Sequence, residues 1–383
     1  MLNSTSPWTP LSDSERRVVL DLLVHGPLSR TELAERLGLS TPSLTRLTRT
    51  LLESGVVREV REEQPHTGGR PLQPLDVDEG LQTFVGIKLT ATHAFAVLTD
   101  LRADIRASLV RELGDRDPAA VAELLAGVVQ ELSEGHGPAA VGVGLGGQVR
   151  ESRFVRRAPF LRWKDVDLGP LVREATDLPS IVTNDLDALM EAEHWFGDGR
   201  DVTSFATITI GVGVGMGLIM HDRLVGGPDS GLGLIGHFPL DPFGPSCPDG
   251  HRGCADAMLV NESIRAQASQ LTGRSMTYDE VLDLAEVGDP AMEQLVARSA
   301  HALGVLVAAV ANIAQPGRII LTGEGVRIAR VGEVRMRESI RRMRDPLASE
   351  PDLRIIDDDP LLWARGAAAV AIQRTVLDRL PEL

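Results

Sequence analysis

Two stretches of this sequence share one hairpin pattern. Residues 84–101 are FVGIKLTATHAFAVLTDL, and residues 204–220 are SFATITIGVGVGMGLIM. Each stretch predicts a pair of largely buried strands, and helical patterns such as residues 119–132 follow. Two similar hairpin-plus-helix lobes predict a duplicated α/β architecture with a cleft between the lobes.

The composition is typical of a soluble globular chain with two or three domains. Of the 383 residues, 43% are hydrophobic and 24% are charged. The sequence has no apolar run of about 18 residues, and its N-terminus lacks the basic and apolar regions of a secretory signal. Two cysteines in so long a chain are not a disulfide framework. We therefore expect a cytoplasmic protein with no membrane partner.

The net charge of −15 is unevenly distributed along the chain. Residues 1–75 contain 9 Arg and 9 Asp or Glu, so the rest of the chain carries the whole excess. A neutral head on an acidic body fits a DNA-reading module joined to a large soluble domain. Chance alone could also leave a short segment neutral.

Three helical segments are predicted at the start of the chain. Residues 12–26 (SDSERRVVLDLLVHG) carry an apolar face at helical spacing. Residues 29–40 begin with a capping box, in which Ser29 pairs with Glu32. Residues 40–55 (STPSLTRLTRTLLESG) have two cap candidates, Ser40 and Thr41, and an early proline, as expected of a helix start.

A short helix, a tight turn and a second helix with a polar outer face indicate a helix-turn-helix. The following residues, GVVREVREEQPHTGGRPLQPL, predict a wing of two short strands joined by a polar loop. A generic helical bundle with a hairpin is the alternative, and we favour the winged helix because spacing, caps and wing occur together. The residues expected to contact DNA are Ser40, Thr41, Ser43, Thr45, Arg46, Arg49, Arg58 and Arg70.

The order of motifs along the chain resembles a ROK-family transcriptional regulator. After the winged helix come HTGGRP, VGVGLGGQV, TNDLDA, GLGLIGH and CPDGHRGCAD. The resemblance covers nearly the whole chain. It implies an α/β protein in which a winged helix-turn-helix precedes a two-lobed, actin-like sugar-kinase fold. We expect residues 1–80 to form the DNA-binding domain with its linker, 81–197 the first lobe, and 198–383 the second lobe with the zinc loop and the C-terminal helix.

The most specific part of the resemblance is the segment with the two cysteines. The family binds a structural zinc through one His and three Cys, and the matching residues here are His237, Cys247, Asp249 and Cys254. Asp249 replaces the middle Cys, and zinc also accepts carboxylate oxygen. The resemblance therefore implies one zinc per chain, with His251 as an alternative fourth ligand. A disulfide is conceivable, but a cytoplasmic setting disfavours it.

The resemblance also implies a site for a sugar or sugar-like effector. The matching residues are Gly146, Gly147, Asn184, Asp185, His237 and Asp256. Asp185 stands at the position of the kinase base, and His237 is expected to turn its second ring nitrogen toward the ligand. Leu234 replaces a family Glu, and Phe160 stands where Asn is frequent, so a standard hexose is in doubt. Taken alone, Asn184-Asp185 is also typical of a helix N-cap.

The turns that hold ATP phosphates in the family's kinases are altered here. Residues 88–92 (KLTAT) replace the D-x-G-x-T motif, so a Thr stands where glycine lets the backbone approach phosphate. The second turn, Gly211-Val212-Gly213, lacks the usual hydroxyl, and Glu324 stands where the family favours glycine. We therefore expect no ATP binding and no enzymatic activity.

We interpret the chain as a DNA-binding transcriptional regulator, expected to be a repressor. Its expected partners are double-stranded operator DNA and a sugar or sugar-derived effector. A homodimer or homotetramer would place two winged helices on a pseudo-palindromic operator. Two alternatives stay open. One is a zinc-stabilised regulator without a small-molecule effector, and the other is a cytoplasmic ATP-dependent sugar kinase.

Overall fold

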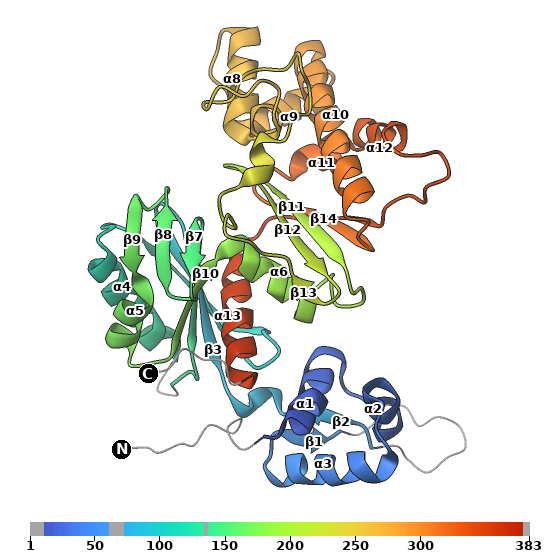
Figure 1. Ribbon diagram of the computed structural model, residues 1–383. Helices are drawn as coiled ribbons and strands as arrows, with labels where there is room; N and C mark the ends of the chain where they lie inside the picture. Colours follow the sequence, from blue (N-terminus) through green and yellow to red (C-terminus); the bar gives the residue numbers. More distant parts are fainter. Residues whose placement is uncertain (1–10, 61–72, 134–136, 378–383) are drawn as a thin grey trace. The chain divides into compact units, whose positions relative to one another are not determined.

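The computed structural model (Figure 1) describes residues 11–60, 73–133 and 137–377. The chain divides into two compact units. The first unit consists of Met1–Phe196 together with Pro360–Leu383, and the second consists of Gly197–Asp359. The N-terminal helices and one α/β lobe therefore share the first unit, while the second unit is a separate α/β lobe.

The three N-terminal helices begin at side-chain caps. They are α1 (Asp13–His25), α2 (Arg30–Leu37) and α3 (Thr41–Glu53). Ser29 and Glu32 form the predicted capping box at α2, and Ser40 caps α3 by accepting a hydrogen bond from the Ser43 N–H. Gly38 ends α2 in the left-handed conformation, φ 64°, which glycine adopts without steric strain. The predicted helices are confirmed.

The helices enclose a small core, and a strand pair follows them. Buried side chains of α1, α2 and α3 belong to one hydrophobic cluster: Val18, Val19, Leu22, Leu23, Leu33, Leu44 and Leu51. Thr48 is also buried, because its hydroxyl donates to the Leu44 carbonyl at 3.0 Å. β1 (Val57–Glu59) pairs antiparallel with β2 (Leu75–Val77), which confirms the strands of the wing.

The first lobe is built on a five-stranded sheet in the order β10-β6-β3-β4-β5. β3 pairs antiparallel with β4 and parallel with β6, as expected for a hairpin joined to a crossover strand. The bounds are β3 Phe84–Leu89, β4 His93–Thr99, β5 Ile105–Glu112, β6 Val141–Leu145 and β10 Ser180–Asn184. A separate three-stranded sheet contains β7 (Gln148–Arg150), β8 (Phe154–Ala158) and β9 (Trp163–Asp167).

Helices cover both faces of this sheet. Val85, Ile87 and Leu89 of β3 share a hydrophobic cluster with residues of α4 (Pro118–Ser133) and α5 (Leu168–Thr176). The opposite face packs on α6 (Asp185–Phe196) and α13 (Pro360–Val376). Successive strand residues point to opposite faces. Gly86 and Lys88 therefore lie on the face that α13 covers.

The C-terminal helix was predicted in the second lobe, and the structure corrects this: α13 belongs to the first unit. Small residues explain the packing. A Cβ atom added to Gly86 of β3 or Gly142 of β6 would overlap backbone atoms of α13 at Ala364 and Ala367. The glycines let the helix approach the sheet closely, which no local pattern in residues 360–376 indicates.

The second unit repeats the sheet plan of the first. Its strand order is β13-β12-β11-β14-β15, and β11 pairs antiparallel with β12 and parallel with β14. This confirms the duplicated architecture. The strands are β11 Phe205–Ile210, β12 Val214–Met220, β13 Arg223–Leu224, β14 Arg318–Thr322 and β15 Leu353–Ile355.

Helices pack against this second sheet in one large core. They are α7 Ala255–Leu259, α8 Asn261–Thr272, α9 Tyr278–Glu286, α10 Pro290–Ile313, α11 Arg327–Val331 and α12 Glu333–Arg342. By length and composition, α10 is the one helix of the described chain that could cross a membrane. Its buried residues, among them Leu303, Leu306 and Val307, instead join the core of this unit, as the central helix of a globular lobe does.

Candidate functional site

The exposed face of α3 carries the side chains predicted to read DNA. Thr41, Thr45, Arg46 and Arg49 are exposed, while Leu44 and Leu51 hold the helix from its other side. Arg49 lies 4.0 Å from Glu53, one turn away. Arg46 makes no ion pair with another described residue. Its guanidinium is therefore available to a partner outside the chain.

The remaining DNA-contact predictions lie at the ends of this motif. Ser40 is exposed and serves as the α3 cap, and Ser43 is half-buried beside it. Arg58 of the wing is half-exposed, 3.8 Å from Glu79. Arg70 lies outside the described residues. One helix and one hairpin thus bring together the predicted DNA residues that the structure describes.

Four of the predicted effector residues meet at the carboxyl ends of β6 and β10 in the first unit. Asn184 ends β10 and caps α6: its Oδ1 accepts from the Leu186 and Asp187 N–H groups at 3.0 and 3.1 Å. Its Nδ2 donates to the Gly147 carbonyl at 2.9 Å. Asn184 is therefore the N-cap of α6, as one of the two interpretations predicted. These hydrogen bonds also fix the position of the next residue, Asp185.

Asp185 is held in an ion pair that the sequence did not suggest. Lys88 of β3 donates from Nζ to Asp185 Oδ2, and both side chains are only 14% exposed. The Lys88 Nζ also lies 4.6 Å from the ring centroid of Trp363 on α13, within cation–π range. In the sequence, Lys88 stands out only as a departure from the family's phosphate motif. The alternation of β3 assigns Lys88 to one face of the sheet, but no local pattern indicates that α13 covers this face.

Gly146 and Gly147 form a tight turn beside this ion pair. A Cβ atom added at Gly146 would lie 3.3 Å from Phe160 Cδ2 and 3.5 Å from Asp185 Oδ2. At Gly147 it would overlap the Arg157 carbonyl. Position 147 therefore requires glycine. At position 146 the absence of a side chain leaves Phe160 and Asp185 next to each other on one surface.

The other two predicted effector residues, His237 and Asp256, lie in the second unit. Asp256 Oδ1 accepts from the Val214 N–H at 3.1 Å, and both its carboxylate oxygens lie against Gly236, next to His237. His237 Nε2 lies 3.4 Å from Asp249 Oδ2, and the contact of this nitrogen with an effector stays a prediction.

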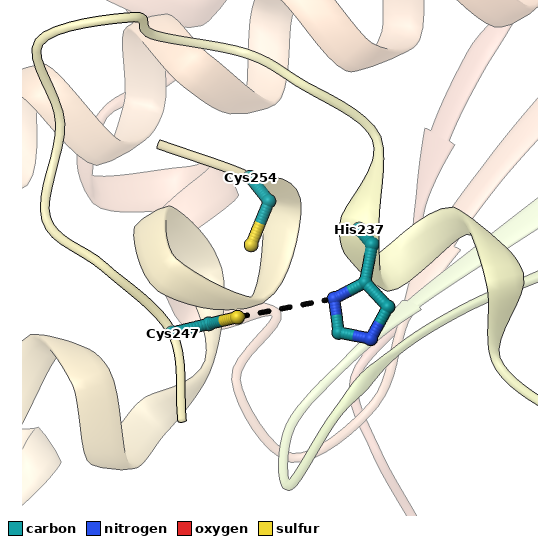
Figure 2. A group of neighbouring side chains, drawn as sticks. All are labelled: His237, Cys247 and Cys254. Carbon is teal, nitrogen blue, oxygen red and sulfur yellow. Dashed lines mark hydrogen bonds between the residues drawn. The ribbon is translucent and has the colours of Figure 1, made fainter. Parts of the chain in front are cut away.

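Three predicted metal ligands converge at one point in the second unit. One potential ligand atom each of His237, Cys247 and Cys254 lies within 4.8 Å of the others, and both cysteines are buried as free thiols. Figure 2 shows the two sulfurs and the His237 ring turned toward one another, with Cys247 Sγ 3.9 Å from His237 Nδ1. Imidazole and thiolate are the donors that zinc prefers, so this group fits a zinc ion.

The turn between the cysteines brings a second histidine to this group. The Cys247 N–H donates to the His251 carbonyl at 2.9 Å, and Gly250 adopts φ 87°, where glycine is favoured. As a result, His251 Nδ1 lies 3.6 Å from Cys247 Sγ, and its ring centroid lies 4.3 Å from that of His237. Asp249 instead contacts the far nitrogen of His237 and lies largely exposed.

Polar groups of the chain itself lie at both altered phosphate turns. The Thr90 hydroxyl donates to the His93 carbonyl and accepts from the His93 N–H, both at 3.0 Å, which closes the β3–β4 turn. In the second unit, a Cβ atom added at Gly211 would lie 3.6 Å from Glu324 Oε2. A carboxylate thus flanks the glycine turn, where it would repel a phosphate.

Comparisons with known proteins agree with this architecture. The ROK family model matches residues 84–372, and the MarR family model matches residues 11–64. The chain belongs to the ROK family and carries an N-terminal winged helix of the MarR type.

Individual relatives resemble the chain along most of its length. The xylose repressor of Bacillus subtilis (strain 168) is 24% identical over 313 residues, which are 80% of this chain and 81% of the repressor. The crystal structure of a ROK family transcriptional regulator, a homolog of the E. coli MLC protein, matches with a TM-score of 0.79 at 24% identity and covers 96% of both chains. The ROK hexokinase from Thermus thermophilus matches with a TM-score of 0.66 at 26% identity over 76% of this chain and 99% of the hexokinase. The fold is therefore shared by regulators and sugar kinases.

Proposed function

We propose that this protein is a DNA-binding transcriptional repressor that responds to a sugar or sugar-like effector. The observation that carries the proposal is the exposed polar face of α3, with Arg46 and Arg49, in a winged helix joined to a ROK domain. Such a helix enters the major groove, and its exposed side chains reach base edges. The likeness to a xylose repressor supports the same role.

We further propose a homodimer or homotetramer in the cytoplasm. Two winged helices in one assembly would bind the two half-sites of a pseudo-palindromic operator. Selection of binding sites from random duplex DNA with the full-length protein tests the proposal. We expect an enriched motif with two related half-sites, and enrichment of no motif would contradict the function.

Arg46→Ala is expected to weaken binding to the selected operator by about 1–3 kcal/mol, because one side chain that reads a base edge contributes roughly that much. Discrimination at one base position should relax at the same time. A gel-shift titration with the operator and with single-base variants measures both effects. The control is Arg111→Ala, which removes an arginine of β5 that pairs with Glu131 of α4. Equal operator affinity of wild type and Arg46→Ala would contradict the assignment of α3.

We propose a structural zinc, one per chain, in the group around Cys247. His237, Cys247 and Cys254 supply three ligands, and the 3.6 Å distance between His251 Nδ1 and Cys247 Sγ supports His251 rather than Asp249 as the fourth. Asp249 then accepts a hydrogen bond from the outer nitrogen of His237 and fixes its ring. Bound zinc would tie the loop of residues 237–254 to the core of this lobe.

The chain is also proposed to lack kinase activity. Lys88 holds the Asp185 carboxylate in an ion pair, so that it does not act as a base, and Glu324 lies beside the glycine turn of the second unit. We expect no ATP-dependent phosphorylation of glucose, xylose or N-acetylglucosamine at high protein concentration in a coupled assay. Turnover that Asp185→Asn abolishes would contradict this prediction and support the sugar-kinase alternative.

A further inference from the structure

The Lys88–Asp185 ion pair is more than a stabilising contact. Both side chains are 14% exposed, and moving two charges out of water is unfavourable enough that a well-packed apolar pair often stabilises a protein as well. The pair is also supported from two sides: the Trp363 ring faces the ammonium, and the Leu186 N–H donates to Asp185 Oδ1 at 2.9 Å. These contacts fix the orientation of both groups before any ligand arrives.

The pair keeps hydrogen-bonding capacity beyond its own contact. An ammonium has three N–H donors, of which Asp185 uses one, and each carboxylate oxygen has a second lone pair. A donor and an acceptor therefore lie side by side at the carboxyl end of β3. Two neighbouring hydroxyl groups on one ligand match this arrangement, because one can donate to Asp185 while the other accepts from Lys88.

An aromatic side chain lies on the same surface. Phe160 is 49% exposed, and its ring and Asp185 Oδ2 both lie within 3.5 Å of the point where a Gly146 side chain would begin. An exposed ring next to oriented polar groups offers an apolar surface to the C–H face of a sugar ring.

We propose that Lys88 is a specificity-determining residue that, together with Asp185, binds two neighbouring hydroxyls of an uncharged sugar. This inference rests on the proposed function, which supplies the effector. Lys88 and Asp185 compensate each other's charge, and the next titratable side chain along α6 is a further carboxylate, Asp187. The ion pair therefore offers no net positive charge to a sugar acid or sugar phosphate, so the site selects against it.

Calorimetric titration of the full-length protein tests this selectivity. The probes are neutral aldopentoses, aldohexoses and N-acetylhexosamines at millimolar concentration, with glucuronate and glucose 6-phosphate as the charged counterparts of glucose. We expect at least one neutral sugar to bind. Both anionic sugars should either fail to bind or bind about tenfold more weakly than this neutral sugar. Lys88→Met should lower the affinity for the neutral sugar by about tenfold or more, because a hydrogen bond from a charged donor is lost.

Two further variants separate ligand contact from folding. Lys88→Met/Asp185→Asn removes both charges and leaves no unpaired carboxylate, so it should melt close to wild type and still fail to bind the sugar. Phe160→Ala should weaken binding without lowering the melting temperature, since the ring is half-exposed. Unchanged sugar affinity in Lys88→Met, tighter binding of an anionic sugar, or binding of none of the sugars would overturn the inference. Operator binding by the same preparations reports on the proposed function separately.

Discussion

Cys247→Ser and Cys254→Ser are each expected to abolish zinc binding and to lower the stability of the second unit. A metal present at a thousand times its dissociation constant stabilises the folded state by about 4 kcal/mol, and each variant should lose a contribution of this size. The two thiols are buried and face His237. The chain has only these two cysteines, so no other thiol can replace either one. Elemental analysis of protein purified without added metal, together with thermal unfolding, measures both effects.

Neighbouring residues provide the controls for the zinc prediction. His251→Ala should release the metal or weaken its binding strongly, whereas Asp249→Ala should retain about one zinc per chain. Wild-type protein stripped with a chelator should melt like Cys254→Ser. Metal-free wild type whose melting temperature does not respond to added zinc would disprove the site. Zinc retained by His251→Ala and lost by Asp249→Ala would show that Asp249 is the fourth ligand.

Asp187→Asn is expected to stabilise the protein at pH 8 by up to about 3 kcal/mol. Burial, and then the nearby carboxylates of Asp185 and Glu191, raise the pKa of Asp187 to about 6. An unfolded Asp has a pKa of about 4, and each pKa unit corresponds to about 1.4 kcal/mol. Between these two values the folded chain binds more protons than the unfolded chain, so this residue lowers stability as the pH rises from 4 to 6.

The pH dependence distinguishes this effect from a packing change. Near pH 3, below both pKa values, Asp187 is largely protonated in the folded and the unfolded state, so wild type and Asp187→Asn should unfold at similar denaturant concentrations. The difference should grow up to about pH 6 and stay constant above it. Asp201→Asn removes a carboxylate that is 75% exposed and serves as the control. A stability gain that is the same at pH 3 and pH 8 would contradict the titration of Asp187 as its cause.

Local patterns in the sequence were sufficient for the elements and for much of the candidate site. The cap at Ser29 was correctly predicted, and the structure selects Ser40 from the two candidates for the next helix, because a helix cap involves residues only three positions apart. The two hairpins were recognised because strand alternation and a short turn are local features. His237, Cys247 and Cys254 could be grouped because the family motif matches them, and the structure brings them together.

Three features depended on the tertiary structure. The placement of α13 in the first unit follows from contacts with Gly86 and Gly142, more than 200 residues earlier in the chain. The ion pair of Lys88 with Asp185 exists because β3 and the start of α6 meet at one end of a sheet. The positions of His251 and Asp249 depend on how the turn folds over Cys247.

The order of elements, the winged helix, the ROK family and the residue types that could bind metal and DNA can all be read from the amino-acid sequence. These properties depend on short-range preferences of the backbone and on the periodicity of apolar side chains. Long-range packing is needed to specify which carboxylate pairs with Lys88, which histidine nitrogen faces the thiols, and which lobe receives the last helix. Such contacts depend on close packing between segments that are far apart in the sequence. The conformational preferences of each short segment do not specify which distant segment it will contact.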